Sequence, residues 1–317
     1  MAGKGLNEHH SNVSARKMHA DEHDIDLPLV RRLLAAQFPQ WVGLPIGPVP
    51  SAGTDNAIYR LGDDKAVRLP RVPRAVPQVG KEHRWLPRLA PHLPLAIPTP
   101  VGKGRPAEGY PWAWSVYRWL DGETATTAHG ADSSDTAAAL AEFVVALQRI
   151  DPSGAPSFGE DNFFRGAPLA LRDGPTRRAI EALRGILDAD AATAAWEAAL
   201  GVAELTSAPV WVHGDLVPGN LLFERGRLSG VIDFGGLGVG DPAYDAMAGW
   251  TLFSGESRAI YRAALGADEE AWARGRGWAL SFGLIALPYY DKSNPALAGI
   301  ARHAIDEVLA DDERDVI

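Results

Sequence analysis

The sequence predicts an α+β protein with two lobes, a small β-rich N-terminal lobe and a larger, mainly helical C-terminal lobe. Residues 58–69 hold two short apolar runs around the tight turn Gly62-Asp63-Asp64, a pattern typical of a β-hairpin. Beyond residue 122, apolar residues recur at helical spacing along most of the chain. The chain passes only once from the β-rich lobe to the helical lobe, and this arrangement predicts a cleft between the two lobes.

We expect the N-terminal lobe to span residues 18–120. It opens with an amphipathic helix predicted over residues 27–40, and the turn-rich residues 51–56 then lead into the hairpin. Prolines break the chain before a helix predicted over residues 78–90, because proline fixes φ and removes a backbone donor. In residues 111–120 aromatic and small side chains alternate, which favours a strand.

The C-terminal lobe is expected to span residues 121–317, with its boundary at the turn Asp121-Gly122. Its first helix is predicted to begin behind an N-cap at Asp135. The next predicted elements are two helices and two short β-like runs, over residues 176–187, 190–205, 209–212 and 228–232. Each β-like run lies beside a polar motif, and we expect the two runs to be neighbours, so that the motif side chains converge.

Composition excludes several classes of protein. At 317 residues, with 46% hydrophobic and 22% charged residues, the chain is typical of a globular protein of about two domains. A net charge of −9 argues against nucleic-acid binding and leaves cationic ligands open, and the absence of cysteine favours a reducing, cytoplasmic location. Residues 1–17 lack the apolar core of a secretory signal and are expected to be a disordered tail. The most apolar stretch, residues 277–287, predicts a buried helix too short to span a membrane.

Two polar motifs of the C-terminal lobe carry the chemistry. The segment HGDLVPGN holds Asp215 and Asn220, and the segment DFG begins at Asp233. Phosphoryl transfer requires a carboxylate that faces the acceptor hydroxyl and oxygen ligands for Mg²⁺ beside the phosphates. Both motifs, in this order and behind a β-rich lobe, match that requirement and indicate phosphoryl transfer.

These motifs resemble those of the aminoglycoside phosphotransferase and choline-kinase-like family of small-molecule kinases, and the resemblance covers nearly everything from Met18 onward. The segment GDPAYD, residues 240–245, looks like the element that follows DFG in this family. The chain has no A-P-E motif and no long activation segment, which disfavours a protein kinase. The resemblance implies a protein-kinase-like fold, ATP or GTP as phosphoryl donor, Mg²⁺ as cofactor and a small-molecule acceptor.

The resemblance also implies a role for individual residues. Asp215 corresponds to the catalytic base, and Asn220 and Asp233 correspond to the Mg²⁺ ligands. Arg68 stands where the family has a phosphate-binding lysine, and Glu82 on the next helix looks like its ion-pair partner. A guanidinium still offers a bidentate fork to phosphate, so the role can persist after this change.

Four further positions are expected at the nucleotide. The loop over residues 51–56 carries one glycine and not G-x-G-x-x-G, so phosphate capping there rests on Gly53, Thr54 and nearby N–H groups. Tyr117 and Trp119 belong to a stretch that resembles the family hinge, where main-chain groups meet the adenine.

Several alternatives stay open for the acceptor. The favoured class is cationic, an aminoglycoside-type antibiotic, which would make the protein a resistance kinase. Six acidic residues after Arg302 either meet its ammonium groups or form a solvated chain end. The other acceptors are a macrolide, a sugar or an amino alcohol, and the non-catalytic alternative is a nucleotide-binding pseudokinase. Residues 160–169 are either a lid over the acceptor or a packed loop, and the protein is either a monomer or a homodimer.

Overall fold

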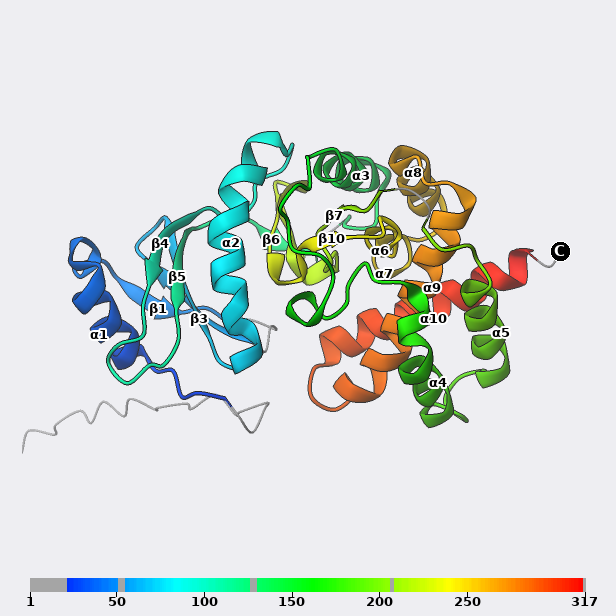
Figure 1. The fold of residues 1–317 in the computed structure, drawn as a ribbon, viewed down its shortest axis with the longest axis horizontal. Helices are drawn as coiled ribbons and strands as arrows, with labels where there is room; N and C mark the ends of the chain where they lie inside the picture. The colour runs from blue at the N-terminus through cyan, green and yellow to red at the C-terminus, as the bar shows by residue number, and fades with distance from the viewer. Residues whose placement is uncertain (1–21, 51–54, 126–129, 206–207, 316–317) are drawn as a thin grey trace, which may run out of the picture.

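The computed structural model describes residues 22–50, 55–125, 130–205 and 208–315. An antiparallel five-stranded sheet with the order β1-β2-β3-β5-β4 lies in the N-terminal lobe (Figure 1). Its strands are β1 (Ile46–Pro48), β2 (Asn56–Leu61), β3 (Lys65–Pro70), β4 (Pro100–Gly104) and β5 (Trp114–Arg118). The predicted hairpin is the β2–β3 pair, closed where Leu61 lies opposite Lys65.

Two helices flank this sheet on opposite sides (Figure 1). The first, α1 (Leu27–Gln37), begins at Asp26, whose carboxylate accepts the N–H of Leu29 at 2.8 Å. Every second residue of β2 is buried, because successive side chains of a strand point to opposite faces of the sheet. The apolar stripe of α1 packs on these buried residues. The second, α2 (Val76–Leu89), lies between the sheet and the C-terminal lobe and therefore carries residues of both interfaces.

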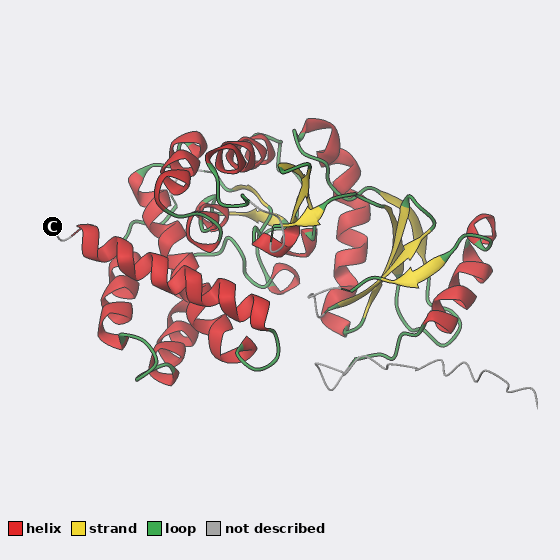
Figure 2. Cartoon of the chain, turned by 180° about the vertical axis from the view of Figure 1, so that it is seen from behind, coloured by secondary structure: helices red, strands yellow, loops and turns green. Residues whose placement is uncertain are grey.

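The C-terminal lobe is mainly helical (Figure 2). Its helices are α3 (Ser134–Gln148), α4 (Asp173–Ala182), α5 (Ala189–Leu200), α6 (Ala243–Ala246), α7 (Ala248–Thr251), α8 (Gly255–Leu265), α9 (Glu269–Tyr290) and α10 (Pro295–Asp315). Two small antiparallel sheets complete it, with the orders β6-β8-β9 and β7-β10. Their strands are β6 (Glu123–Thr124), β7 (Val210–Val212), β8 (Leu221–Glu224), β9 (Arg227–Val231) and β10 (Gly238–Gly240).

The long helix α9 runs through the core of this lobe. Trp278, Leu280 and Leu284 are buried on it, which confirms the buried helix predicted at residues 277–287. A Cβ on Gly283 would lie 2.7 Å from the carbonyl oxygen of Ala301, so glycine lets α10 pack closely against α9. Within the described ranges, no helix has the length and apolar character needed to cross a bilayer.

The structure differs from the sequence prediction in several details. The N-cap of α3 is Ser133, whose hydroxyl accepts the N–H of Thr136 at 3.3 Å, while Asp135 lies inside the first turn. The helix predicted over residues 176–187 is α4, which begins and ends earlier. The helices predicted over residues 27–40 and 190–205 are α1 and α5, and both end earlier than expected. The two motif-bearing β runs are neighbours, as expected, since His213 after β7 contacts Ile232 after β9, but they belong to different sheets: β7 pairs with β10 and β9 pairs with β8.

Candidate active site

A buried carboxylate holds the segment that follows β7. Asp245 is 1% exposed, and its two carboxylate oxygens accept the main-chain N–H groups of His213 at 2.7 Å and Gly214 at 2.9 Å. Gly214 has φ +80°, and a Cβ there would lie 2.5 Å from the carbonyl oxygen of Gly236. Only glycine fits this position. The backbone directly before Asp215 is thereby fixed.

The buried side chain of His213 holds the same segment, the residues that follow β7, in place. Its Nδ1 accepts the main-chain N–H of Asp215 at 3.1 Å, and its Nε2 lies 3.2 Å from the carbonyl oxygen of Ile232. Because Nδ1 is an acceptor, the ring is the neutral tautomer that donates from Nε2. Burial lowers the pKa of His213 to about 4, so the ring stays neutral near pH 7 and has a structural role.

The carboxylate of Asp215 lies against the side chain of Asn220. The Nδ2 of Asn220 donates to the main-chain oxygen of Asp215 at 2.9 Å and to its Oδ2 at 3.1 Å. Burial raises the pKa of Asp215, and the guanidinium of Arg165, 3.3 Å from Oδ1, opposes that rise. The Asp215 side chain is still 24% exposed, so a substrate hydroxyl can reach it.

Asp233 follows β9 in a left-handed conformation, with φ 61° and ψ 72°, which is rare for a residue other than glycine. Such strain clusters at functional sites. Its Oδ1 lies 2.9 Å from Nη2 of Arg68, and although burial acts to raise the pKa of Asp233, Arg68 holds it below the usual value. The N–H of Ile232 donates to the oxygen of Asn220 at 2.8 Å, and this bond brings the two motifs together.

Arg68 also forms the ion pair with Glu82 that was expected from the sequence. Its Nη1 lies 2.7 Å from Oε1 of Glu82, which is 2% exposed on α2. The hydroxyl of Tyr117 donates to Oε2 of the same carboxylate. Lys81, one residue before Glu82, donates to the carbonyl oxygens that follow Asp233, those of Gly235 at 2.7 Å and Leu237 at 2.9 Å. Helix α2 therefore joins the sheet to the DFG segment.

The comparisons with known proteins agree with this geometry. The sequence model of the phosphotransferase enzyme family matches residues 47–278, a range that includes all the residues of this site. This chain belongs to the phosphotransferase enzyme family. It is therefore an enzyme of the kinase type that acts on hydroxyl groups. No curated protein matches its sequence.

Solved structures show the fold of this phosphotransferase. The GDP complex of wild-type aminoglycoside 2'-phosphotransferase-IIIa is 20% identical and has a TM-score of 0.66, with 89% of this chain and 98% of that chain covered. The apoenzyme of macrolide 2'-phosphotransferase MphH from Brachybacterium faecium is 24% identical, with a TM-score of 0.58 and the same two coverages, 89% and 98%. The streptomycin–ATP complex of APH(2")-IIa is 19% identical, with a TM-score of 0.54 and coverages of 83% and 91%. The protein-kinase-like, two-lobed α+β fold is confirmed.

The four positions expected to contact the nucleotide, Gly53, Thr54, Tyr117 and Trp119, differ in what the structure shows of them. Gly53 and Thr54 fall outside the described residues. The side chain of Tyr117 is buried against Glu82. It therefore leaves only the main-chain groups of Tyr117 for the contact with adenine that was expected of the hinge. The main-chain N–H of Trp119 donates to the oxygen of Asp64 at 2.8 Å, and its ring stacks under Arg60 at 4.0 Å. That N–H is therefore engaged within the N-terminal lobe.

The donor set of the phosphotransferase fits Mg²⁺. Asp233 offers a carboxylate that is 41% exposed, and Asn220 offers an amide oxygen, since its Nδ2 makes both bonds to Asp215. Oxygen ligands of this kind, completed by phosphate oxygens and water, are those that Mg²⁺ prefers. Among the described side chains, no group of three or more His, Asp or Glu forms a closed metal cage, so these two ligands would form an open site.

Sequence reasoning missed Lys81 of this site and, beside the predicted base, Arg165. Arg165 lies in the segment 160–169, for which a lid and a packed loop were both considered. The segment is a packed loop: Asp241 donates its N–H to the oxygen of Gly166 at 2.8 Å, and Phe158 donates to Val239 at 3.1 Å. The signal that could have found Arg165 is a single basic residue in a stretch of glycine, proline and aromatic residues.

Two of the acidic residues near the C-terminus are held within the C-terminal lobe. Glu307 and Asp311 both pair with Arg258, whose side chain is 7% exposed, and Asp311 also accepts Nε1–H of Trp250 at 2.7 Å. Helix α10 ends on the far side of the C-terminal lobe from the N-terminal lobe (Figures 1 and 2). These two carboxylates therefore stabilise the lobe.

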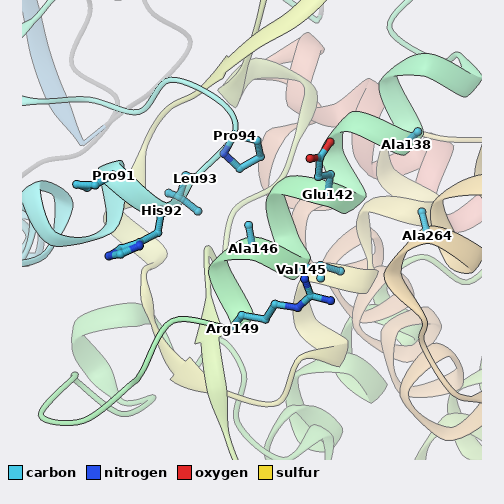
Figure 3. A pocket seen from close by; sticks show the side chains of 10 residues that line it. All are labelled: Pro91, His92, Leu93, Pro94, Ala138, Glu142, Val145, Ala146, Arg149 and Ala264. Atoms are coloured by element: carbon cyan, nitrogen blue, oxygen red, sulfur yellow. The ribbon is translucent and has the colours of Figure 1, made fainter.

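A separate hollow of about 480 Å³ lies where η3 (Ala90–His92) approaches α3 and α8 (Figure 3). His92, Glu142 and Arg149 are its charged or polar lining residues. None of its lining residues belongs to the site built around Asp215, so this hollow is not the nucleotide site.

Proposed function

We propose that this phosphotransferase transfers the terminal phosphoryl group of ATP or GTP to a hydroxyl group of a small molecule, with Mg²⁺ as cofactor. One observation supports this proposal above the others. The carboxylate of Asp215, held by Asn220, is near enough to Asp233 for the charge of Asp233 to raise its pKa, and Asp233 is paired with Arg68 of the other lobe. A base for the hydroxyl and a set of groups for the phosphates therefore face the same space.

Each group has a role that follows from its chemistry. Asp215 accepts the proton of the acceptor hydroxyl, because it is a partly exposed carboxylate with a fixed orientation. Arg68 presents a fork of donors to the phosphates of the nucleotide. Asn220 and Asp233 would hold Mg²⁺, which supplies positive charge next to the phosphate oxygens. The buried Glu82 orients Arg68.

For the acceptor we propose first an aminoglycoside-type antibiotic. Solved structures with the same fold include complexes with kanamycin and with streptomycin. Those likenesses lie at 20% and 19% identity, so they support the choice of compounds to test and do not define the acceptor.

A macrolide is the second candidate, and the surface of the loop that carries Arg165 favours it. Phe163 and Phe164 in that loop are 39% and 42% exposed, and aromatic faces of this kind suit a large apolar acceptor. Arg165 places a positive charge beside Asp215, which disfavours a polycation at that point.

The test is release of ADP or GDP in the presence of a panel of aminoglycosides, macrolides, sugars and amino alcohols, followed by mass spectrometry of each compound. We expect one class to gain the mass of a phosphoryl group in a reaction that EDTA abolishes. The Asp215→Asn variant is the control for contaminating kinases. Nucleotide binding without phosphorylation of any hydroxyl compound would contradict the proposal.

A further inference from the structure

The loop over residues 159–166 is built to hold Arg165 at the site. Asn162 is 2% exposed, its Oδ1 accepts the N–H of Gly159 at 2.9 Å, and its Nδ2 donates to the oxygen of Arg165 at 3.0 Å. Phe163 and Phe164, just before Arg165, have φ values of 59° and 58°, a conformation that residues other than glycine adopt only when their surroundings impose it. The main chain at Arg165 is thus fixed by the residues before it, and after it by the bond from the N–H of Asp241 to the oxygen of Gly166.

The guanidinium of Arg165 occupies a space that Gly236 leaves open. A Cβ on Gly236 would lie 2.5 Å from Nη1 of Arg165, and the backbone of Gly236 packs directly on that of Gly214. Nη2 reaches to 3.3 Å from Oδ1 of Asp215, the carboxylate oxygen that Asn220 does not hold. Gly236 lies three residues after Asp233. The guanidinium is therefore placed between the segments that carry the base and the metal-binding carboxylate.

The transferring phosphoryl group must lie in this same region, because it travels from the nucleotide to a hydroxyl that faces Asp215. It is strongly anionic, and a phosphotransferase lowers its barrier chiefly with positive charge. The segment from His213 to Asn220 contains no lysine or arginine. Arg68, the other arginine of the site, is paired with Glu82 and Asp233, and no ion pair joins it to Asp215 among the described residues.

We propose that Arg165 is a catalytic residue whose guanidinium binds the oxygens of the transferring phosphoryl group. This inference rests on the proposed function. In the reaction, the bond between the γ-phosphorus and the bridging oxygen of the nucleotide breaks and a bond from the acceptor oxygen to phosphorus forms. The acceptor proton passes to Asp215, and the nucleoside diphosphate leaves. Arg165 exchanges no proton and forms no covalent bond, and it pairs with Asp215 when no phosphoryl group is present.

The first experiment measures hydrolysis of ATP and of GTP without an acceptor, where water takes the place of the hydroxyl. For the faster nucleotide, we expect Arg165→Ala to lower the rate at least about 10²-fold, as loss of a transition-state arginine does in other phosphoryl transfers. Added guanidinium should restore part of the rate. The control is Arg184→Ala, which removes an exposed arginine paired with Glu181 and should leave hydrolysis unchanged. Hydrolysis at the wild-type rate in Arg165→Ala would show that Arg165 contacts only the acceptor and would overturn the proposal.

The second experiment needs no turnover. Thermal unfolding is followed with Mg²⁺ and ADP (or GDP, to match the preferred nucleotide), with and without aluminium fluoride, which mimics the transferring phosphoryl group. We expect the wild type and Arg184→Ala to gain further stability from the fluoride, and Arg165→Ala to keep only the shift caused by the diphosphate. Equal fluoride responses in all three proteins would overturn the proposal. A wild type that neither binds nor hydrolyses a nucleotide would instead overturn the proposed function itself, and this inference with it.

Discussion

Arg68 and Asp233 lie 2.9 Å apart, from Nη2 to Oδ1, although 165 residues separate them in the chain. Arg68 belongs to β3 of the N-terminal lobe and Asp233 to the DFG segment of the C-terminal lobe. With Lys81 bound to the carbonyls of Gly235 and Leu237, this pair joins the lobes at the site itself. In the proposed function, the phosphates of a bound nucleotide would replace this contact, so that two side chains that hold the lobes together in this structure would take part in binding it.

Arg68→Ala should weaken use of the nucleotide and destabilise the protein. It removes a charge-assisted contact to phosphate. It also leaves the buried carboxylate of Glu82 with the Tyr117 hydroxyl as its one hydrogen-bond partner in the part of the chain that the structure describes. We expect the KM for the nucleotide to rise about 10-fold or more with the acceptor KM little changed, and the free energy of unfolding to fall by about 3 kcal/mol. Steady-state kinetics and urea unfolding measure the two effects. Arg68→Lys keeps the charge and should recover part of both, whereas a rise confined to the acceptor KM would place Arg68 outside the nucleotide site.

Asp215→Asn should abolish the base and hardly change the shape of the site. The loss in kcat is expected to be about 10²-fold or more, with nucleotide affinity retained. Isothermal titration with ADP or GDP measures the affinity, and initial rates measure kcat. Asp63→Asn, in the exposed turn of the hairpin, is the matched control. Turnover near the wild-type rate in Asp215→Asn would show that another group accepts the proton.

The two proposed Mg²⁺ ligands should respond differently to added metal. Asp233→Ala removes a charged ligand, so raising the Mg²⁺ concentration should rescue its rate only in part. Asn220→Ala removes a neutral amide that water can replace, so its rescue should be more complete unless loss of the bonds to Asp215 limits it. Titration of activity with Mg²⁺ tests both variants. The same Mg²⁺ dependence in wild type and both variants would exclude them as ligands.

Local patterns account for the parts of the structure that the sequence predicted well. The hairpin β2–β3 and the helix α2 follow from alternation, turn residues and prolines within about 35 consecutive residues, so no distant partner was needed. The N-cap of α3 differs by two positions because Ser133 and Asp135 are both good capping residues and only the turn geometry selects between them.

What the sequence could not show depends on contacts between distant segments. Val210–Val212 could pair with any short apolar run, and its true partner, Gly238–Gly240, is too rich in glycine to look like a strand. Arg165 reaches Asp215 from a loop fifty residues earlier, and neither periodicity nor a motif connects them. For the same reason the C-terminal acids resembled a solvated or substrate-binding run, whereas Arg258 on another helix holds two of them.

Asp311→Asn should lower stability and leave kinetics unchanged. The variant keeps an oxygen near Trp250 and loses the charge that pairs with the buried Arg258. We expect the free energy of unfolding to fall by about 1–3 kcal/mol. Asp306→Asn changes an exposed acid of the same helix and should have almost no effect. If Asp311→Asn kept full stability and raised the KM of a polycationic acceptor, the acceptor-anchor role of this helix would be restored.

The carboxyl group of Asp245 should give the protein a pH-dependent stability. Burial raises its pKa to about 6, against the opposing effect of the N–H groups of Gly214 and His213 that it accepts. The pKa of Asp245 in the folded state therefore lies above its value in the unfolded state. At pH values between these two pKa values the folded state binds more protons than the unfolded state, which stabilises it. This contribution to stability is lost as the pH rises through about 6. Asp245→Asn cannot titrate, so the difference in unfolding free energy, wild type minus variant, should grow by about 1 kcal/mol from pH 7 to pH 5. Urea unfolding at both pH values measures this difference. Parallel pH dependence in the two proteins would mean that Asp245 is already ionised well below pH 5 and that its bonds to the catalytic segment outweigh its burial.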